Sequence, residues 1–254
     1  MPNKIIQILD TLGHYFVFLL EIIRSIPKKP FRFSRCLEEI EQIGVNSVLI
    51  IFLSGAAMGM IFSLQLISFL QPFSMEIGAG AAVSVALARE LGPVITTLML
   101  IAKNGSAMAA ELGTMKVTEQ IDALESMSIS VVHYLVLPKL AACLLVFPVL
   151  TLLANVIGLI GAYAIAIPLF NVDSAGYLDY LFDFLSPRDV YFGLIKSVVM
   201  GGMISTICCF FGLRTAQGAR GVGDSATRAV VVSSVSILVA DYLLTSLMLP
   251  FIYE

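Results

Sequence analysis

The sequence has few charged residues. Asp, Glu, Lys and Arg together make up 13% of its 254 residues, against ~25% in soluble globular domains. Hydrophobic residues make up 58%, and the mean hydropathy is +0.95. This composition excludes an ordinary soluble domain and predicts an integral membrane protein. The net charge is only −3, so no nucleic-acid partner is expected.

Cysteine and the common catalytic motifs are also scarce. Of the four cysteines, Cys143, Cys208 and Cys209 lie inside apolar runs, where neither a disulfide framework nor a metal site is expected. No GxxxxGK[ST] phosphate loop occurs in the sequence, so the chain is not expected to bind ATP itself. We therefore predict no catalytic residue, no metal ligand and no cofactor, and we expect that the chain is not an enzyme.

Five apolar runs are long enough to cross a bilayer as helices, which takes about 20 residues. Asp224 or Ser225 is expected to cap the last of them. The predicted fold class is an all-α integral membrane protein with five transmembrane helices. The spans are expected at about residues 43–70, 77–102, 140–170, 190–213 and 229–252.

Basic residues gather in three segments: the leader, the second-to-third connection and the fourth-to-fifth connection. Basic connections stay on the cytoplasmic side, which predicts a cytoplasmic N-terminus, five spans and a periplasmic C-terminus. Residues 171–189, with Arg188 alone among the basic residues there, are then expected to face outward. The basic residues are Lys4, Arg24, Lys28, Lys29, Arg32 and Arg35, then Lys103, Lys116 and Lys139, then Arg214, Arg220 and Arg228.

Apolar residues of the leader recur at helical spacing. Polar residues fall between them, which predicts an amphipathic helix lying in the membrane interface. A short true span is the alternative, although a sixth span would break the charge distribution. A second short helix is expected at 34–42, so residues 1–42 are predicted to form interfacial and elbow helices ahead of a membrane domain at 43–254. The apolar set is Ile5, Leu9, Leu12, Phe16, Leu19 and Ile23.

Four ionisable residues lie inside the predicted spans. Each costs about 2.5–3.5 kcal/mol at the centre of a membrane helix, so a function is expected to retain them. We predict that they form the polar rim of a substrate cavity. A purely structural ion-pair network and a proton relay are the alternatives. The four are Arg89, Glu90, Lys196 and Asp241.

Small residues mark places where helices approach closely. Gly55 and Gly59 form a GxxxG pair in the first span, and Gly158 and Gly161 follow Asn155 along one face of the third. Such residues let helix backbones pack together in a membrane. Gly92-Pro93 is expected to bend the second span beside its charged pair, because proline removes a backbone donor and clashes with the preceding turn.

The connection at 103–139 is long for a loop between membrane helices. Its apolar residues Val117, Ile121 and Leu124 recur at helical spacing, and acidic residues lie between them. This pattern predicts a helix that docks a cytoplasmic partner, and a solvated interfacial helix without a partner is the alternative.

Residues 89–127, RELGPVITTLMLIAKNGSAMAAELGTMKVTEQIDALESM, resemble the signature of the MlaE/YrbE permeases, the membrane subunits of MCE-type ABC transporters. The likeness continues through VVHYLVLPKLAA and GARGVGDSATRAVVVSSVSILVADYLLT, and covers most of the chain after Ser84. One departure is visible, because the family usually carries Arg before the GSA tripeptide and here Lys103-Asn104 precedes Gly105. Lysine keeps the charge but not the bidentate hydrogen bonding of arginine.

The resemblance implies a homodimeric permease in the bacterial inner membrane. It implies two copies of a cytoplasmic ABC ATPase, which binds the ATP, a hexameric periplasmic MCE protein, and a small STAS-like subunit on the ATPase. The function implied is phospholipid transport between the inner membrane and the MCE protein, which maintains outer-membrane lipid asymmetry.

The resemblance also implies roles for particular residues. The four intramembrane charges would line the polar part of the lipid cavity, and residues 105–127 would form the coupling helix that fits the ATPase. Apolar cavity residues are proposed at Leu64, Leu70, Leu91 and Val94, and ATPase contacts at Glu111, Lys116, Glu119, Asp122 and Glu125.

Two other classes of function stay open. The first is an ion-coupled carrier of an apolar substrate that uses Glu90 and Asp241 and has no ATPase. Such a carrier has no need of a coupling segment. The second is a non-transporting membrane scaffold, which would tolerate alanine at all four intramembrane charges.

Overall fold

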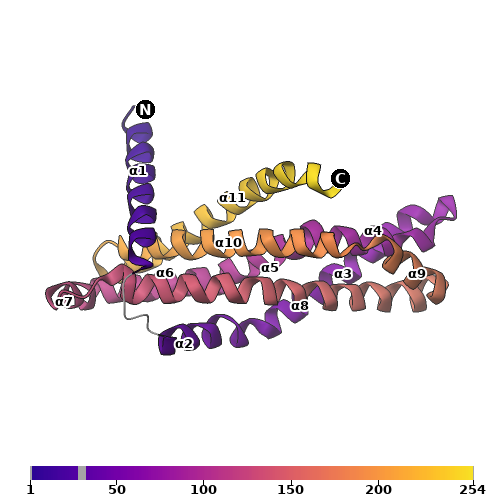
Figure 1. The fold of residues 1–254 in the computed structure, drawn as a ribbon, viewed down its shortest axis with the longest axis horizontal. Coiled ribbons are helices and arrows are strands. Elements are labelled where there is room, and N and C mark those ends of the chain that lie inside the picture. The colour runs from indigo at the N-terminus through magenta and orange to yellow at the C-terminus, as the bar shows by residue number, and fades with distance from the viewer. Residues whose placement is uncertain (1, 28–32, 254) are drawn as a thin grey trace. The chain divides into compact units, whose positions relative to one another are not determined.

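The computed structural model describes residues 2–27 and 33–253, with side chains described for 9–27 and 33–250. Every regular element in these residues is a helix (Figure 1). The chain divides into two compact units, each assembled from three separate stretches of sequence. The first unit takes in the described parts of 1–43, 101–144 and 201–235, and the second those of 44–100, 145–200 and 236–254.

Helices of the first unit come from the leader and from the second-to-third connection. They are α1 (Pro2–Ser25), α2 (Phe33–Ile43), η5 (Ile101–Gly105), α6 (Ser106–Val117), α7 (Gln120–Ser126) and η6 (Val132–Val136).

The second unit holds most of the first two spans and one short helix. Its elements are η1 (Val45–Ser47), α3 (Val48–Leu70), η2 (Gln71–Phe73), η3 (Glu76–Gly78), α4 (Ala79–Ala86), η4 (Leu87–Leu91), α5 (Gly92–Leu100) and α9 (Ser174–Phe184). Three long helices have residues in both units: α8 (Leu137–Phe170), α10 (Pro187–Leu213) and α11 (Gly218–Tyr253).

Five helical stretches in the described residues are long and apolar enough to cross a membrane, which confirms the predicted number. They are Phe33–Phe73, Glu76–Val117, Val132–Phe170, Pro187–Leu213 and Gly218–Pro250. Helix α1 is not among these stretches. Its place in the membrane interface and the domain boundary at residue 43 stay predictions.

One predicted helix cap was wrong, and the helix of the second span is longer than the predicted span. The helical path continues past Ala102 through η5 and α6 to Val117, and the end of the membrane span near Ala102 stays a prediction. A charge at Lys103 ends an apolar run, but it does not break a helix. Helix α11 begins at Gly218, so Asp224 and Ser225 lie inside it and do not cap it. Gly218 has φ +87°, a conformation that glycine adopts readily.

The charged pair of the second span lies in a π-helical turn. This turn, η4, holds Arg89 and Glu90, and Pro93 follows it at the second residue of α5. A proline ring clashes with the carbonyl four residues back. The wider π turn accommodates the ring without ending the helical path.

Helices α3 and α8 approach closely through small residues, as predicted. A Cβ on Gly55 would lie 2.9 Å from the carbonyl oxygen of Ala154, and one on Gly59 would overlap the backbone of Gly158. Ser63, one turn further along α3, donates a hydrogen bond of 3.0 Å to the Ala162 carbonyl of α8. Backbone contact rather than side-chain interlocking therefore sets the distance between these two helices.

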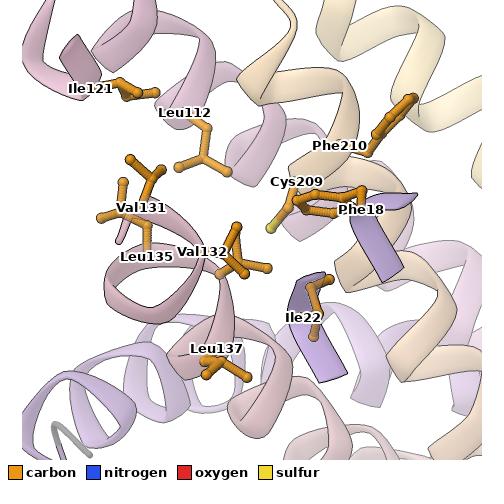
Figure 2. Packing of buried hydrophobic residues seen from close by; sticks show 11 residues of the cluster. Phe18, Ile22, Leu112, Ile121, Val131, Val132, Leu135, Leu137, Cys209 and Phe210 are labelled. Atoms are coloured by element: carbon orange, nitrogen blue, oxygen red, sulfur yellow. The ribbon is translucent and has the colours of Figure 1, made fainter. Parts of the chain in front are cut away.

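The apolar core of the first unit includes part of the leader (Figure 2). Phe18 and Ile22 of α1 are buried in it, and the ring of Phe18 lies 5.8 Å from that of Phe210. Tyr15 and Thr206 also form a hydroxyl-to-hydroxyl hydrogen bond of 2.8 Å. Contacts within the first unit thus fix α1.

Some leader residues used in the charge and spacing patterns cannot be placed. Lys28, Lys29 and Arg32 lie outside the described residues, and so do the side chains of Lys4 and Ile5.

Candidate functional site

A buried lysine organises the polar centre of the second unit. Lys196 of α10 is 2% exposed. Its Nζ donates to Oε2 of Glu90 at 2.6 Å, to Oγ1 of Thr245 at 2.7 Å and to the backbone carbonyl of Arg89 at 3.1 Å. These three bonds use all three N–H donors of an ammonium group.

Asp241 of α11 is the second carboxylate beside this lysine. Its Oδ1 lies 3.2 Å from Nζ of Lys196, but it makes no hydrogen bond. The three donors of Lys196 are already used, so the attraction to Asp241 is purely ionic. Thr245, one helical turn further along α11, donates to the Asp241 backbone carbonyl at 2.8 Å. The sequence patterns did not point to Thr245. We call Lys196, Glu90, Asp241 and Thr245 the Lys196 network.

Arg89 takes a different partner from its neighbour Glu90. Its Nε donates to Oδ1 of Asp189 at 2.7 Å, and Asp189 is 1% exposed. The other carboxylate oxygen of Asp189 accepts a hydrogen bond of 3.0 Å from the backbone N–H of Ser186. The four predicted charges therefore do not form one set.

Asp189 was missed as a site residue because it ends the segment 171–189, which carries several aspartates and was expected to face outward. Its place in the first turn of α10, where a helix dipole favours a carboxylate, is the signal that distinguishes it.

The predicted apolar cavity residues all belong to the second unit. Leu64 of α3 is 42% exposed, while Leu70, Leu91 and Val94 are partly buried. Leu70 packs against the cluster around Tyr177, and Leu91 packs against the cluster around Val83. Their role in holding acyl chains stays a prediction.

The predicted coupling segment forms a helix–turn–helix in the first unit. Glu119 joins α6 to α7 with φ 60°, a left-handed conformation that turns the chain. Nζ of Lys116 donates to Oδ1 of Asp122 at 2.6 Å across this turn. Glu125 lies on the same short helix as Asp122 and is exposed. The ion pair across the turn thus ties α7, which carries Asp122 and Glu125, to the end of α6.

Glu111, the remaining predicted coupling residue, binds a second buried lysine. Lys139 of α8 is 1% exposed, and its Nζ donates to Oε2 of Glu111 at 2.8 Å and to Oε1 of Glu39 of α2 at 2.6 Å. We call these three residues the Lys139 network. From the sequence, Lys139 was predicted to lie in the connection between the second and third spans. The apolar run on both sides of it was the signal that it is buried.

Comparison with known proteins gives one consistent family. Residues 36–247 match the family Permease MlaE. A probable ABC transporter permease protein of Rickettsia bellii is 38% identical over 96% of this chain and 95% of that protein.

Two further relatives carry more specific names. The intermembrane phospholipid transport system permease protein MlaE of Haemophilus influenzae is 32% identical over 98% of this chain and 95% of that protein. The chloroplastic protein trigalactosyldiacylglycerol 1 of Arabidopsis thaliana is 34% identical over 89% of this chain and 65% of that protein. The chain therefore belongs to the MlaE permease family, as a multi-pass protein of the inner membrane.

Proposed function

We propose that this chain is the permease subunit of an ABC transporter that moves phospholipids between the inner membrane and a periplasmic MCE protein, and so maintains outer-membrane lipid asymmetry. The observation that carries the proposal is the family match over residues 36–247, which takes in both lysine networks. The name of the Haemophilus influenzae relative supports a phospholipid substrate. In this proposal the chain is a transport subunit and not an enzyme.

The proposed layout follows the basic residues. The N-terminus and the α6–α7 segment face the cytoplasm, α1 lies in the membrane interface, and the C-terminus faces the periplasm. Residues 1–42 serve as interfacial and elbow helices for the membrane domain at 43–254.

The proposed assembly is built on two copies of the chain. Two ABC ATPase subunits dock on the cytoplasmic side and bind the ATP, so the permease needs no cofactor of its own. A hexameric MCE protein receives or delivers the lipid on the periplasmic side, and a small STAS-like subunit sits on the ATPase. The name of the Rickettsia bellii relative, a probable ABC transporter permease protein, supports the ATPase partner.

Transport is proposed to be mechanical. Closure of the ATPases moves the α6–α7 segments, and this squeezes a lipid cavity at the dimer interface. The apolar residues Leu64, Leu70, Leu91 and Val94 hold acyl chains in that cavity.

The Lys196 network is proposed to meet the lipid headgroup. The Glu90 side chain is 39% exposed, whereas that of Lys196 is 3% exposed. A lipid phosphate reaching the network from the exposed side competes with Glu90 for the Nζ of Lys196. Phosphate oxygens, like carboxylate oxygens, accept charge-assisted hydrogen bonds from an ammonium group, so the exchange replaces one charged hydrogen bond by another.

Native mass spectrometry of the tagged protein, purified gently from its own membrane, tests this proposal. Two copies of the chain with two ATPases, six MCE subunits and retained phospholipid are the expected result. A bare monomer or dimer without an ATPase contradicts the proposal. The ion-coupled carrier built on Glu90 and Asp241 then becomes the leading function.

A further inference from the structure

The first unit has a groove between α1 and the α6–α7 segment that the proposed transport path does not use. Its volume is about 500 Å³. Helix α1 contributes Phe18 and Glu21 to the wall, and α7 contributes Ile121 and Glu125. The chain between α7 and η6, residues 128–131, closes one side. We call this the α1–α7 groove.

The floor of the α1–α7 groove is apolar and preformed. Phe18, Ile121, Val131 and Val132 line it and belong to one buried cluster, in which they converge from separate elements (Figure 2). Left-handed residues, Glu119 with φ 60° and Ser128 with φ 58°, lie on either side of α7. Docking against a floor that is already packed requires little ordering of the permease.

The rim of the groove carries an excess of negative charge. Glu21 and Glu125 both line it and are exposed, and within the described side chains neither forms a salt bridge. Lys116 is the one basic residue among the lining residues. Its Nζ is bound to Asp122 at 2.6 Å, and its attraction to Glu125 is weaker. A cation therefore fits this rim, while a lipid phosphate is repelled.

We propose that the α1–α7 groove receives a basic side chain, with an adjoining apolar side chain, from the cytoplasmic ATPase. The basic group lies between Glu21 and Glu125, and the apolar group covers Phe18 and Ile121. This inference rests on the proposed function and adds the leader helix α1 to the docking surface. Contacts of opposite charge around an apolar centre are the usual arrangement of a specific protein interface.

Charge reversal tests the rim. In the complete complex, the double variant Glu21→Lys with Glu125→Lys is expected to lower ATPase recovery with the tagged permease about tenfold or more, since like charges then face each other. The matched control is Glu41→Lys on α2, an exposed glutamate outside the groove, for which recovery should change less than about twofold.

Photo-crosslinking tests the occupant of the groove without reversing any charge. Benzoylphenylalanine replaces Ile129, which lines the groove, or Leu37, which is 52% exposed on α2. Mass spectrometry of the Ile129 adduct should identify an ATPase peptide that contains Lys or Arg next to an apolar residue, and the Leu37 adduct should not contain this peptide.

The two proposals fail in different ways. Wild-type permease that retains the ATPase, together with unchanged recovery for the double variant, overturns the groove inference alone. A crosslink from Ile129 only to lipid or to a second copy of the chain overturns it as well. Wild-type permease that retains no ATPase overturns the proposed function.

Discussion

Among the described side chains, each compact unit contains one buried lysine between two carboxylates, but the two lysines are bonded differently. Lys139 donates hydrogen bonds to both Glu39 and Glu111. Lys196 donates to only one carboxylate, Glu90, and gives its other N–H groups to Thr245 and to a backbone carbonyl. Oδ1 of Asp241 forms an ion pair with Lys196 but has no hydrogen-bond partner.

This difference suggests different roles. The Lys139 network joins α2, α6 and α8 by hydrogen bonds between charged groups, which indicates a structural role. In the Lys196 network one carboxylate oxygen, Oδ1 of Asp241, has no hydrogen bond. Replacing a hydrogen-bond partner in this network therefore costs less free energy than in the Lys139 network. We therefore expect the first network to govern stability and the second to govern transport. Three substitutions test this comparison, and a fourth separates packing in the second unit from its charges.

The largest loss of stability is expected for Lys139→Met. Removing the cation leaves Glu39 and Glu111 facing each other without compensation, and breaking a buried ion pair costs about 3–5 kcal/mol. The lower end applies, because the Glu111 side chain is 45% exposed. Thermal unfolding of the detergent-purified protein measures the effect. Lys139→Arg keeps the charge and should recover most of the stability, and a melting temperature unchanged by Lys139→Met contradicts the structural role.

Lys196→Met is expected to slow lipid transfer strongly while lowering stability less than Lys139→Met. Lys196→Met removes a hydrogen bond from one carboxylate, Glu90, whereas Lys139→Met removes one from each of two carboxylates. Lipid transfer between reconstituted vesicles containing the complete complex, measured beside the melting temperature, separates the two effects. We expect lipid transfer to fall about a hundredfold, because losing a buried hydrogen bond between charged groups costs about 3 kcal/mol. Normal transfer by a folded variant would remove the Lys196 network from the mechanism.

Gly59→Ala tests packing in the second unit apart from its charges. The added Cβ overlaps the backbone of Gly158, so the helices must separate, at a cost of about 1–3 kcal/mol. Gly13→Ala on α1 is the matched control, because no atom lies within 4 Å of its added Cβ. Equal melting temperatures for the two variants would show that α3 and α8 do not depend on backbone contact.

The smallest effect is expected for Thr245→Val, which keeps the shape of the side chain and removes its hydroxyl. Lys196 then loses one acceptor, at a cost of about 1 kcal/mol, which corresponds to about a fivefold fall in lipid transfer. Thr245→Ser restores the acceptor and serves as the control. Transfer that falls equally in both variants would assign the effect to packing and not to the hydrogen bond.

Properties that depend on local composition could be predicted from the sequence. Five spans follow from the lengths of apolar runs, and the predicted number is confirmed. Gly55 and Gly59 were expected at a close helix contact because only small residues allow one, and they lie against α8. The four intramembrane charges stood out because burial of each one is costly, although their role in transport stays a prediction.

Partner choice could not be predicted, because it depends on residues far apart in the chain. Arg89 binds Asp189 across 100 residues of sequence, and Lys139 binds Glu39 across the same separation. Neighbouring residues also diverge, since Arg89 and Glu90 share one π turn and face different partners. The sequence by itself thus determined which side chains need a partner, since the cost of burying a charge belongs to the residue and its local run. Only the tertiary structure decided which partner each one receives, since ion pairs and hydrogen bonds require atoms within about 3 Å, and only packing brings distant segments that close.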